Sequence, residues 1–261
     1  MPIQSTGLVA QNVLTQEVLR MVLLAVASYF GGLAVRYRNV RANYTRKIIH
    51  FIQFGSPFIF QPFFPFEHTW WTSVITLTFL LGYLFVVLEP VRSRIPFFDI
   101  CFSAVDRPED RPYTLTWLIT QTLATYAVIF PMAYWLRQYD LESMFLIAIL
   151  VTGLGDGLAE PVGVYYGRHK YPVRLLFTST QYFRSLEGSF CVWLVAFIVI
   201  VCLRDSFTSG VEFYLALAAI PLAMTLAEAV SPHTWDAPLL YFAGGSSVIA
   251  VHQLARAISG A

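Results

Sequence analysis

Long apolar runs follow one another along almost the whole chain, separated by short polar segments. A helix needs about 20 apolar residues to cross a bilayer, and shorter spans also occur. Eight runs meet this description, at residues 18–35, 48–64, 70–88, 115–136, 143–160, 187–203, 211–230 and 237–255. The pattern predicts an all-α, polytopic helical membrane bundle that forms a single transmembrane domain over residues 1–261.

The composition agrees with a membrane protein. Only 13% of the residues are charged and 57% are hydrophobic, whereas a soluble domain carries about 25% charged residues. The net charge of +1 gives no reason to expect a nucleic-acid partner. The three cysteines lack metal-ligand spacing, so neither a zinc site nor a structural disulfide is expected.

The Lys and Arg residues predict the orientation. With eight spans, 13 of the 17 Lys and Arg residues fall in one set of alternate loops, which leaves 4 for the other loops and both termini. The positive-inside rule places the richer set in the cytoplasm and both termini outside. The cytoplasmic loops lie near 36–47, 89–114, 161–186 and 231–236. Two prolines and mixed charge predict that the loop 89–114 is irregular and solvated.

Four acidic residues lie in or beside apolar runs, where charge is costly: Asp156, Glu160, Glu187 and Glu228. A carboxylate at the centre of a membrane helix costs about 2.5 to 3.5 kcal/mol on insertion scales. Such residues usually line a cavity or a pathway. We therefore expect these four to be functional.

Asp156 and Glu160 are four residues apart, so on a helix they share one face. Two carboxylates on one face repel unless a cation lies between them, and Mg²⁺ commonly takes one or two carboxylates together with water and phosphate. Pro161 is expected to break or kink the helix that carries Glu160.

The glycines around these acids allow two interpretations. Gly155 and Gly157 would let backbone N–H groups approach an anion closely. Gly157 also completes a small-xxx-small pattern with Gly153, and Gly163 does so with Gly167, as at helix–helix contacts. The packing interpretation explains the glycines but not the acids.

Basic residues occur at two predicted cytoplasmic span ends. Arg46, Lys47 and His50 begin the second span, where they either anchor the helix or bind a phosphate. Arg184 and Ser185 precede the sixth span, with Ser185 a predicted N-cap and Glu187 in the first turn. A helix N-terminus flanked by basic residues is also an anion site.

Glu228 and Asp236 flank the short loop between the last two spans. Glu228 lies near the C-terminal end of its helix, where its charge opposes the helix dipole. Asp236 begins the next helix, where an acid is favourable for local reasons. The charge pattern puts both at the cytoplasmic face, together with the other clusters, so acids for a metal and bases for phosphates are expected to converge there.

The spacing of these residues resembles the polyprenol kinases, a group that includes dolichol, phytol and farnesol kinases and is related to the phosphatidate cytidylyltransferases. The central block, Gly155-Asp156-x-x-Ala159-x-x-x-Gly163-x-x-x-Gly167-x-x-Lys170, is the most specific part. Arg46-Lys47-x-x-His50, Arg184-Ser185-x-x-Gly188, Glu228 and Asp236 complete the resemblance. This chain departs from the pattern at Arg184, Ala237, Thr234 and Val164, where the family commonly has Lys, Asn, Gly and Arg.

The resemblance implies transfer of a phosphoryl group from a nucleoside triphosphate, typically CTP, to the hydroxyl of an isoprenoid or other lipid alcohol. On this hypothesis the metal ligands for Mg²⁺ are drawn from Asp156, Glu160, Glu228 and Asp236. The nucleotide and its phosphates contact Arg46, Lys47, Gly155, Gly157, Gly163, Gly167, Lys170, Arg184 and Ser185. The acceptor of the hydroxyl proton is either His50 or a carboxylate, and Glu187 would orient Arg184 or the metal shell.

Other functions remain open at this point. A CTP:lipid cytidylyltransferase would release pyrophosphate rather than CDP. A secondary transporter also has buried acids and broken helices, and a membrane scaffold would leave the acids unexplained. The kinase hypothesis implies a lipid alcohol, a nucleotide and the bilayer as partners, and a multi-pass location with its site on the cytoplasmic face, in the inner membrane if the cell is bacterial. The lipid and the oligomeric state stay open.

Overall fold

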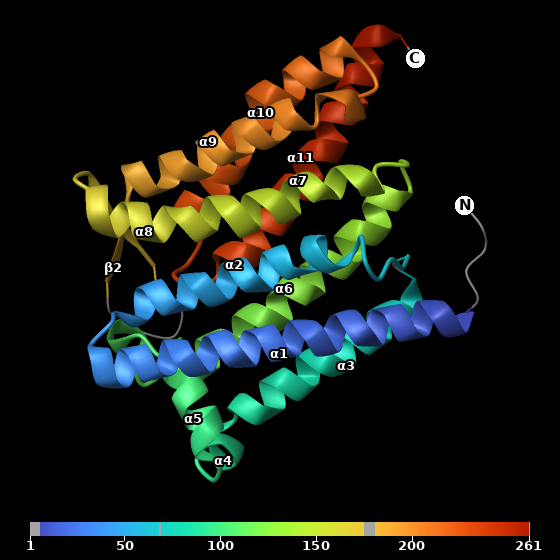
Figure 1. Ribbon diagram of the computed structural model, residues 1–261. Coiled ribbons are helices and arrows are strands. Elements are labelled where there is room, and N and C mark those ends of the chain that lie inside the picture. The colour runs from blue at the N-terminus through green and yellow to red at the C-terminus, as the bar shows by residue number, and fades with distance from the viewer. Residues whose placement is uncertain (1–5, 68, 175–180, 261) are drawn as a thin grey trace. The chain divides into compact units, whose positions relative to one another are not determined.

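The computed structural model describes residues 6–67, 69–174 and 181–260, and the chain is almost entirely helical there (Figure 1). It divides into two compact units, residues 1–115 and 116–261. The single-domain prediction stays a prediction.

The first unit is built on a long helix, α1, that packs against its neighbours α2, α3 and α5 (Figure 1). Its elements are α1 (Thr6–Arg38), α2 (Ala42–Phe60), α3 (Trp70–Val87), α4 (Glu89–Arg92), α5 (Pro96–Ser103) and the 3₁₀ turn η1 (Pro108–Asp110). Leu24 of α1, Ile49 of α2 and Ala104 form the centre of its apolar packing. α3 begins with a reciprocal cap between Thr69 and Thr72, which satisfies backbone N–H groups that a helix start leaves open.

The second unit packs α9 and α10 side by side, with α11 against α10 and α8 against α9 (Figure 1). Its helices are α6 (Thr114–Arg137), α7 (Phe145–Leu150), α8 (Gly157–Tyr166), α9 (Leu186–Cys202), α10 (Gly210–Val230) and α11 (Asp236–Ser259). Short turns stand at η2 (Glu142–Met144) and η4 (Arg204–Ser206). The strands β1 (Lys170–Val173) and β2 (Tyr182–Ser185) form an antiparallel hairpin in which Lys170 is paired with Ser185.

A π-helical segment, η3 (Val151–Asp156), joins α7 to α8 without a break. π-helical turns are rare and occur frequently at functional sites. The segment ends at Asp156, and α8 continues through Pro161 to Tyr166. Pro161 therefore does not break this helix, because the proline lies inside α8 and the helix runs on for five more residues; the alternative, a kink at Pro161, stays a prediction.

The structure supports the prediction of a helical membrane protein. In the part of the chain that the structure describes, five helices are long and apolar enough to cross a membrane: Thr6–Arg38, Trp70–Val87, Thr114–Arg137, Glu142–Tyr166 and Gly210–Val230. A sixth apolar helix, α9, is shorter. The remaining predicted spans, 48–64 and 237–255, overlap α2 and α11, which are helical but do not meet the same measure of length and apolarity.

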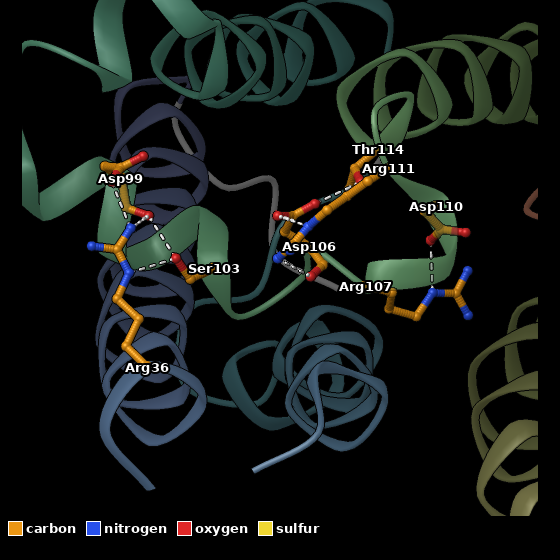
Figure 2. Close-up of polar contacts among 8 residues, drawn as sticks. All are labelled: Arg36, Asp99, Ser103, Asp106, Arg107, Asp110, Arg111 and Thr114. Carbon is orange, nitrogen blue, oxygen red and sulfur yellow. Dashed lines mark hydrogen bonds and ion pairs between the residues drawn. The ribbon is translucent and has the colours of Figure 1, made fainter. Parts of the chain in front are cut away.

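The segment 89–114 is more ordered than its composition predicts. It holds α4, α5 and η1, and its charged residues form ion pairs (Figure 2). The Arg107 Nε lies 2.7 Å from the Asp110 carboxylate, and both side chains are buried. The expectation of an irregular segment is therefore wrong, because charges of opposite sign three residues apart satisfy one another locally, whereas residues 93–97 and 111–113 are exposed as expected. A second contact joins Arg36 of α1 to Asp99 of α5 at 2.5 Å, which fixes α5 against α1.

Candidate active site

The second unit brings several distant polar segments together around Arg184. This residue lies on β2, and 10% of its side chain is exposed. Its Nη1 lies 3.3 Å from the Glu228 carboxylate and its Nη2 lies 3.5 Å from the Asp236 carboxylate. Nη1 also donates to the Glu228 carbonyl oxygen and, at 2.8 Å, to the Ser231 hydroxyl. One guanidinium therefore connects β2 to the end of α10 and the start of α11.

The local sequence explains how Arg184 is presented. Ser185 follows it and caps α9, because the Ser185 hydroxyl accepts from the Gly188 N–H at 3.1 Å. The predicted N-cap is confirmed. The cap changes the chain from strand to helix at one residue, so the side chain of Arg184 is held beside the N-terminus of α9.

Glu228 is held from a second direction by residues that the motif analysis did not single out. The Ser189 hydroxyl donates to the second carboxylate oxygen of Glu228 at 2.8 Å, and the Tyr171 hydroxyl lies 2.6 Å from Ser189. Ser189 lies one helical turn after the cap residue Ser185, so spacing alone could have placed it on the same face. Tyr171 follows Lys170 on β1. Its position in the sequence did not indicate a contact with Ser189.

The charges affect one another's ionisation. Burial alone would lower the pKa of Arg184, but Asp236, Glu228 and Asp156 together raise it above its ordinary value. Asp156 therefore lies within electrostatic reach of the guanidinium. Burial, followed by the charge of Glu228, raises the pKa of Tyr171, so its hydroxyl stays protonated at neutral pH.

The loop between α10 and α11 is tied to the hairpin. The His233 N–H donates to the Arg174 carbonyl at 2.8 Å, and the His233 ring stacks on Tyr182 with 3.6 Å between centroids. Thr234 next to it has a φ of 68°, in the left-handed region. A β-branched residue is strained in that region. The polyprenol kinases, which the motifs of this chain resemble, commonly have glycine at this position. Asp236 then accepts from the Gln121 amide at 3.5 Å and from the Ala237 N–H at 3.1 Å.

Glu187 is not paired with Arg184, one of the two partners predicted for it, and its predicted alternative role in the metal shell stays a prediction. Its carboxylate accepts from the backbone N–H groups of Arg168 and His169 at 3.2 and 3.3 Å, and it lies 2.9 Å from the His169 ring. The structure pairs Glu187 with His169 rather than with Arg184, since the first turn of α9 directs it toward the residues before β1. The orienting role expected for it is assigned instead to Glu228 and Asp236.

The glycines have packing roles in this structure. A Cβ at Gly155 would lie 3.3 Å from the Val192 Cα of α9. A Cβ at Gly163 or at Gly167 would lie 2.8 Å from the Ser185 side chain, and one at Gly188 would lie 2.7 Å from the Ala159 carbonyl oxygen. These positions let α8 approach β2 and α9 closely. Gly157 is buried as the first residue of α8, and a direct role of the glycines in nucleotide binding stays a prediction.

The other predicted residues fall in two places. Glu160 lies one turn after Asp156 and is half-buried, and Lys170 is exposed on β1. Arg46, Lys47 and His50 lie on α2 in the first unit, where Lys47 is buried and His50 contacts Phe54. The predicted loop 161–186 includes residues 175–180, which lie outside the described residues. Of the predicted set, the second unit thus brings Asp156, Arg184, Ser185, Glu228 and Asp236 into one cluster.

The comparisons with known proteins give one relative. The chain is 35% identical over 104 residues to a phytol kinase from Synechocystis sp., and this covers 40% of the chain and 42% of that protein. The chain therefore matches less than half the length of this curated relative. No protein-family model matches the chain, and no solved structure matches it. The similarity supports a distant relationship to this phytol kinase.

Proposed function

We propose that this protein is a membrane-embedded lipid-alcohol kinase that transfers the γ-phosphoryl group of CTP to the hydroxyl of an isoprenoid or related alcohol. The observation that carries the proposal is the Arg184 cluster, in which a buried guanidinium is fixed by Glu228 and Asp236 and interacts with Asp156. Similarity to a phytol kinase supports a kinase over a cytidylyltransferase or a transporter. The choice of CTP rests on the resemblance of the motifs to polyprenol kinases.

Phosphoryl transfer depends on positioning and on neutralising charge more than on covalent chemistry by the protein. Arg184 provides a fixed positive charge for phosphate oxygens, because two carboxylates and the Ser231 hydroxyl hold its guanidinium in one place. The exposed Lys170 of the same unit completes the proposed phosphate-binding set, and phosphate binding by Arg46 and Lys47 of the first unit stays a prediction. In the transfer, the lipid hydroxyl loses its proton to a carboxylate of the cluster. The hydroxyl oxygen then bonds to the γ-phosphorus as the bond to the β-phosphate bridging oxygen breaks, and CDP leaves.

The donor set fits magnesium in part. Among the described residues, no group of three or more His, Cys, Asp or Glu side chains is arranged to hold a metal. Mg²⁺ is commonly bound by only one or two carboxylates together with substrate phosphates. Asp156 and Glu160, one turn apart on the continuous η3–α8 helix, can supply those two. Glu228 and Asp236 are paired with Arg184, so we assign them to the guanidinium. Bound magnesium would neutralise charge on the β- and γ-phosphates.

The proposed topology has eight spans, both termini outside and the active site at the cytoplasmic face. Its support is the distribution of Lys and Arg, 13 of 17 in one set of loops. In a bacterial cell this places the protein in the inner membrane. Cysteine labelling of a cysteine-free variant, with single cysteines at position 140 and position 174, would test the assigned sides.

The central experiment uses purified protein in detergent with γ-labelled CTP or ATP, Mg²⁺ and a panel of alcohols: phytol, farnesol, geranylgeraniol, dolichol and diacylglycerol. We expect label in the organic phase and CDP as the second product. Pyrophosphate release with a cytidylyl-lipid product would instead show the cytidylyltransferase reaction. No transfer to any lipid would refute the kinase.

The variant Asp156→Asn tests the predicted metal ligand in the same transfer assay. We expect turnover to fall at least 10²-fold while the protein still inserts and remains monodisperse, because the substitution removes one charge and almost no volume. Asp140→Asn is the control, since Asp140 is exposed in a turn with a φ of 57° that asparagine also adopts. Wild-type turnover in Asp156→Asn would refute its assignment.

A further inference from the structure

The first unit contains an apolar hollow of about 490 Å³ between α1, α3 and α5. Met21, Leu24 and Ala25 of α1 form one wall, and Phe79 and Gly82 of α3 form another. No charged residue is among those that line it. Ligand sites for small molecules have volumes of about 300 to 1,000 Å³ and mostly apolar walls, so the hollow has the size and surface of a binding site.

The hollow is elongated along the helices. On α1 its lining runs from Met21 to Ser28, and on α3 from Thr78 to Val87. At 1.5 Å per residue these stretches measure roughly 10 and 14 Å. With about 30 Å³ for a unit the size of a water molecule, the volume accommodates roughly 16 carbon atoms of a chain. This shape and capacity suit a single hydrocarbon chain lying parallel to α1 and α3.

Two of the four polar side chains in the wall, Thr78 and Cys101, contact backbone carbonyls. The Thr78 hydroxyl donates to the Val74 carbonyl at 2.8 Å, and the Cys101 thiol contacts the Ala25 carbonyl at 3.8 Å. Burial raises the pKa of Cys101 to about 11, so the thiol stays neutral. A charged headgroup would find no residue of opposite charge on these walls, whereas a hydrocarbon chain needs none.

Gly82 shows that the space is open. A Cβ built at Gly82 would meet no atom within 4 Å, unlike the packing glycines of the second unit. Close approach of two helices therefore does not account for this glycine. Phe97 and Phe98 of α5 add aromatic surface to the lining, and Tyr29 stacks on Phe97 with 5.1 Å between ring centroids, which supports the α5 wall.

We infer that this hollow binds the hydrocarbon tail of the lipid alcohol and holds about 15 carbons of an isoprenoid chain. The inference rests on the proposed function for the identity of the alcohol, but binding itself does not require phosphoryl transfer. The tail site lies within the first unit, on α1, α3 and α5, and its walls set the chain length that the protein prefers.

The test is photolabelling, which reads binding without catalysis. Purified protein in nanodiscs is irradiated with a C20 isoprenoid alcohol that carries a diazirine in its tail, and labelled peptides are identified by mass spectrometry. We expect label on α1, α3 and α5. Unlabelled C20 alcohol should compete, whereas excess phosphatidylcholine should not.

Gly82→Leu fills the hollow from α3 and should reduce this labelling at least 10-fold, with Gly82→Ala intermediate. Gly55→Leu on α2 is the matched control, because a Cβ there also meets nothing within 4 Å and Gly55 does not line the hollow. Size-exclusion chromatography confirms that each variant is folded. Unchanged labelling in Gly82→Leu, or equal competition by phosphatidylcholine, would overturn the inference.

A kinetic measurement separates the two proposals. If the protein is a kinase, Gly82→Leu should raise KM for a C20 alcohol at least 10-fold, whereas Gly55→Leu should leave it within 2-fold of wild type. If no variant transfers phosphate but Gly82-dependent labelling persists, the proposed function fails and the tail site stands. If transfer occurs and chain-length preference is the same in Gly82→Leu, the tail site fails alone.

Discussion

Two buried glutamates lie at opposite ends of α10. Glu212 is in its first turn and Glu228 is in its last, with 2% and 4% of their surface exposed. At 1.5 Å per residue they are separated by roughly 24 Å along the helix. The same side chain, on the same helix and equally buried, thus has two different environments.

The partners of Glu212 are explained by local structure. It accepts from the N–H and hydroxyl of Thr208 at 2.8 and 2.6 Å, and it lies 2.8 Å from the His252 ring of α11. A carboxylate in the first turn also interacts favourably with the helix dipole. Its role is consistent with beginning α10 and fixing α11 beside it.

Glu228 has no such local explanation. A carboxylate in the last turn opposes the helix dipole, and its partners Arg184 and Ser189 come from residues far away in sequence. A buried acid that long-range contacts must stabilise against its own helix is a stronger indication of a functional site than burial alone. Three substitutions test this difference.

The largest effect is expected from Glu228→Gln. Removing one partner of a buried ion pair costs about 3 to 5 kcal/mol, because the remaining charge is left uncompensated, and Asp236 should keep the loss near 3 kcal/mol. Transfer activity should fall with stability. Thermal unfolding in detergent and the γ-phosphate assay measure the two effects. Wild-type activity in a folded Glu228→Gln protein would show that the acid is structural.

Glu212→Gln should cost less, about 1 to 2 kcal/mol, because it weakens a hydrogen bond to a charged group while the amide oxygen can still accept from Thr208. Activity per folded molecule should stay within 2-fold of wild type. The same two assays apply. A loss of turnover as large as that of Glu228→Gln would remove the distinction between the two ends of α10.

Thr234→Gly should have the smallest effect and the opposite sign. Thr234 has a φ of 68° in the loop that follows Glu228. Glycine at this position would relieve the backbone strain of a β-branched residue in the left-handed region, which should raise the free energy of unfolding by about 1 kcal/mol. Gly7→Ala, where a Cβ meets nothing within 4 Å, provides a comparison without strain. A lower melting temperature for Thr234→Gly would mean that the threonine side chain stabilises the loop more than its backbone strain costs.

The sequence predicted the helical architecture well, because long apolar runs need helices to satisfy the backbone in a membrane. It also identified Asp156, Arg184, Glu228 and Asp236, since charges in apolar surroundings are easily recognised. It did not predict that Glu228 and Asp236 pair with Arg184, or that Ser189 bonds to Glu228 and Tyr171 bonds to Ser189. Those contacts depend on how β2, α9 and α10 pack. The sequence analysis did not single out Glu212, because an acid in the first turn after a serine N-cap is typical of an ordinary helix start.

The π-helical segment that ends at Asp156 winds more slowly than an α-helix, because its N–H groups bond five residues back rather than four. Six residues wound in this way turn through roughly the same angle as five α-helical residues at 100° each. Deleting one residue between 151 and 155 would therefore let the segment become α-helical while Asp156 and Glu160 kept their direction. At this one place the protein should keep its carboxylates in position after a shortening that would rotate an ordinary helix by about 100°.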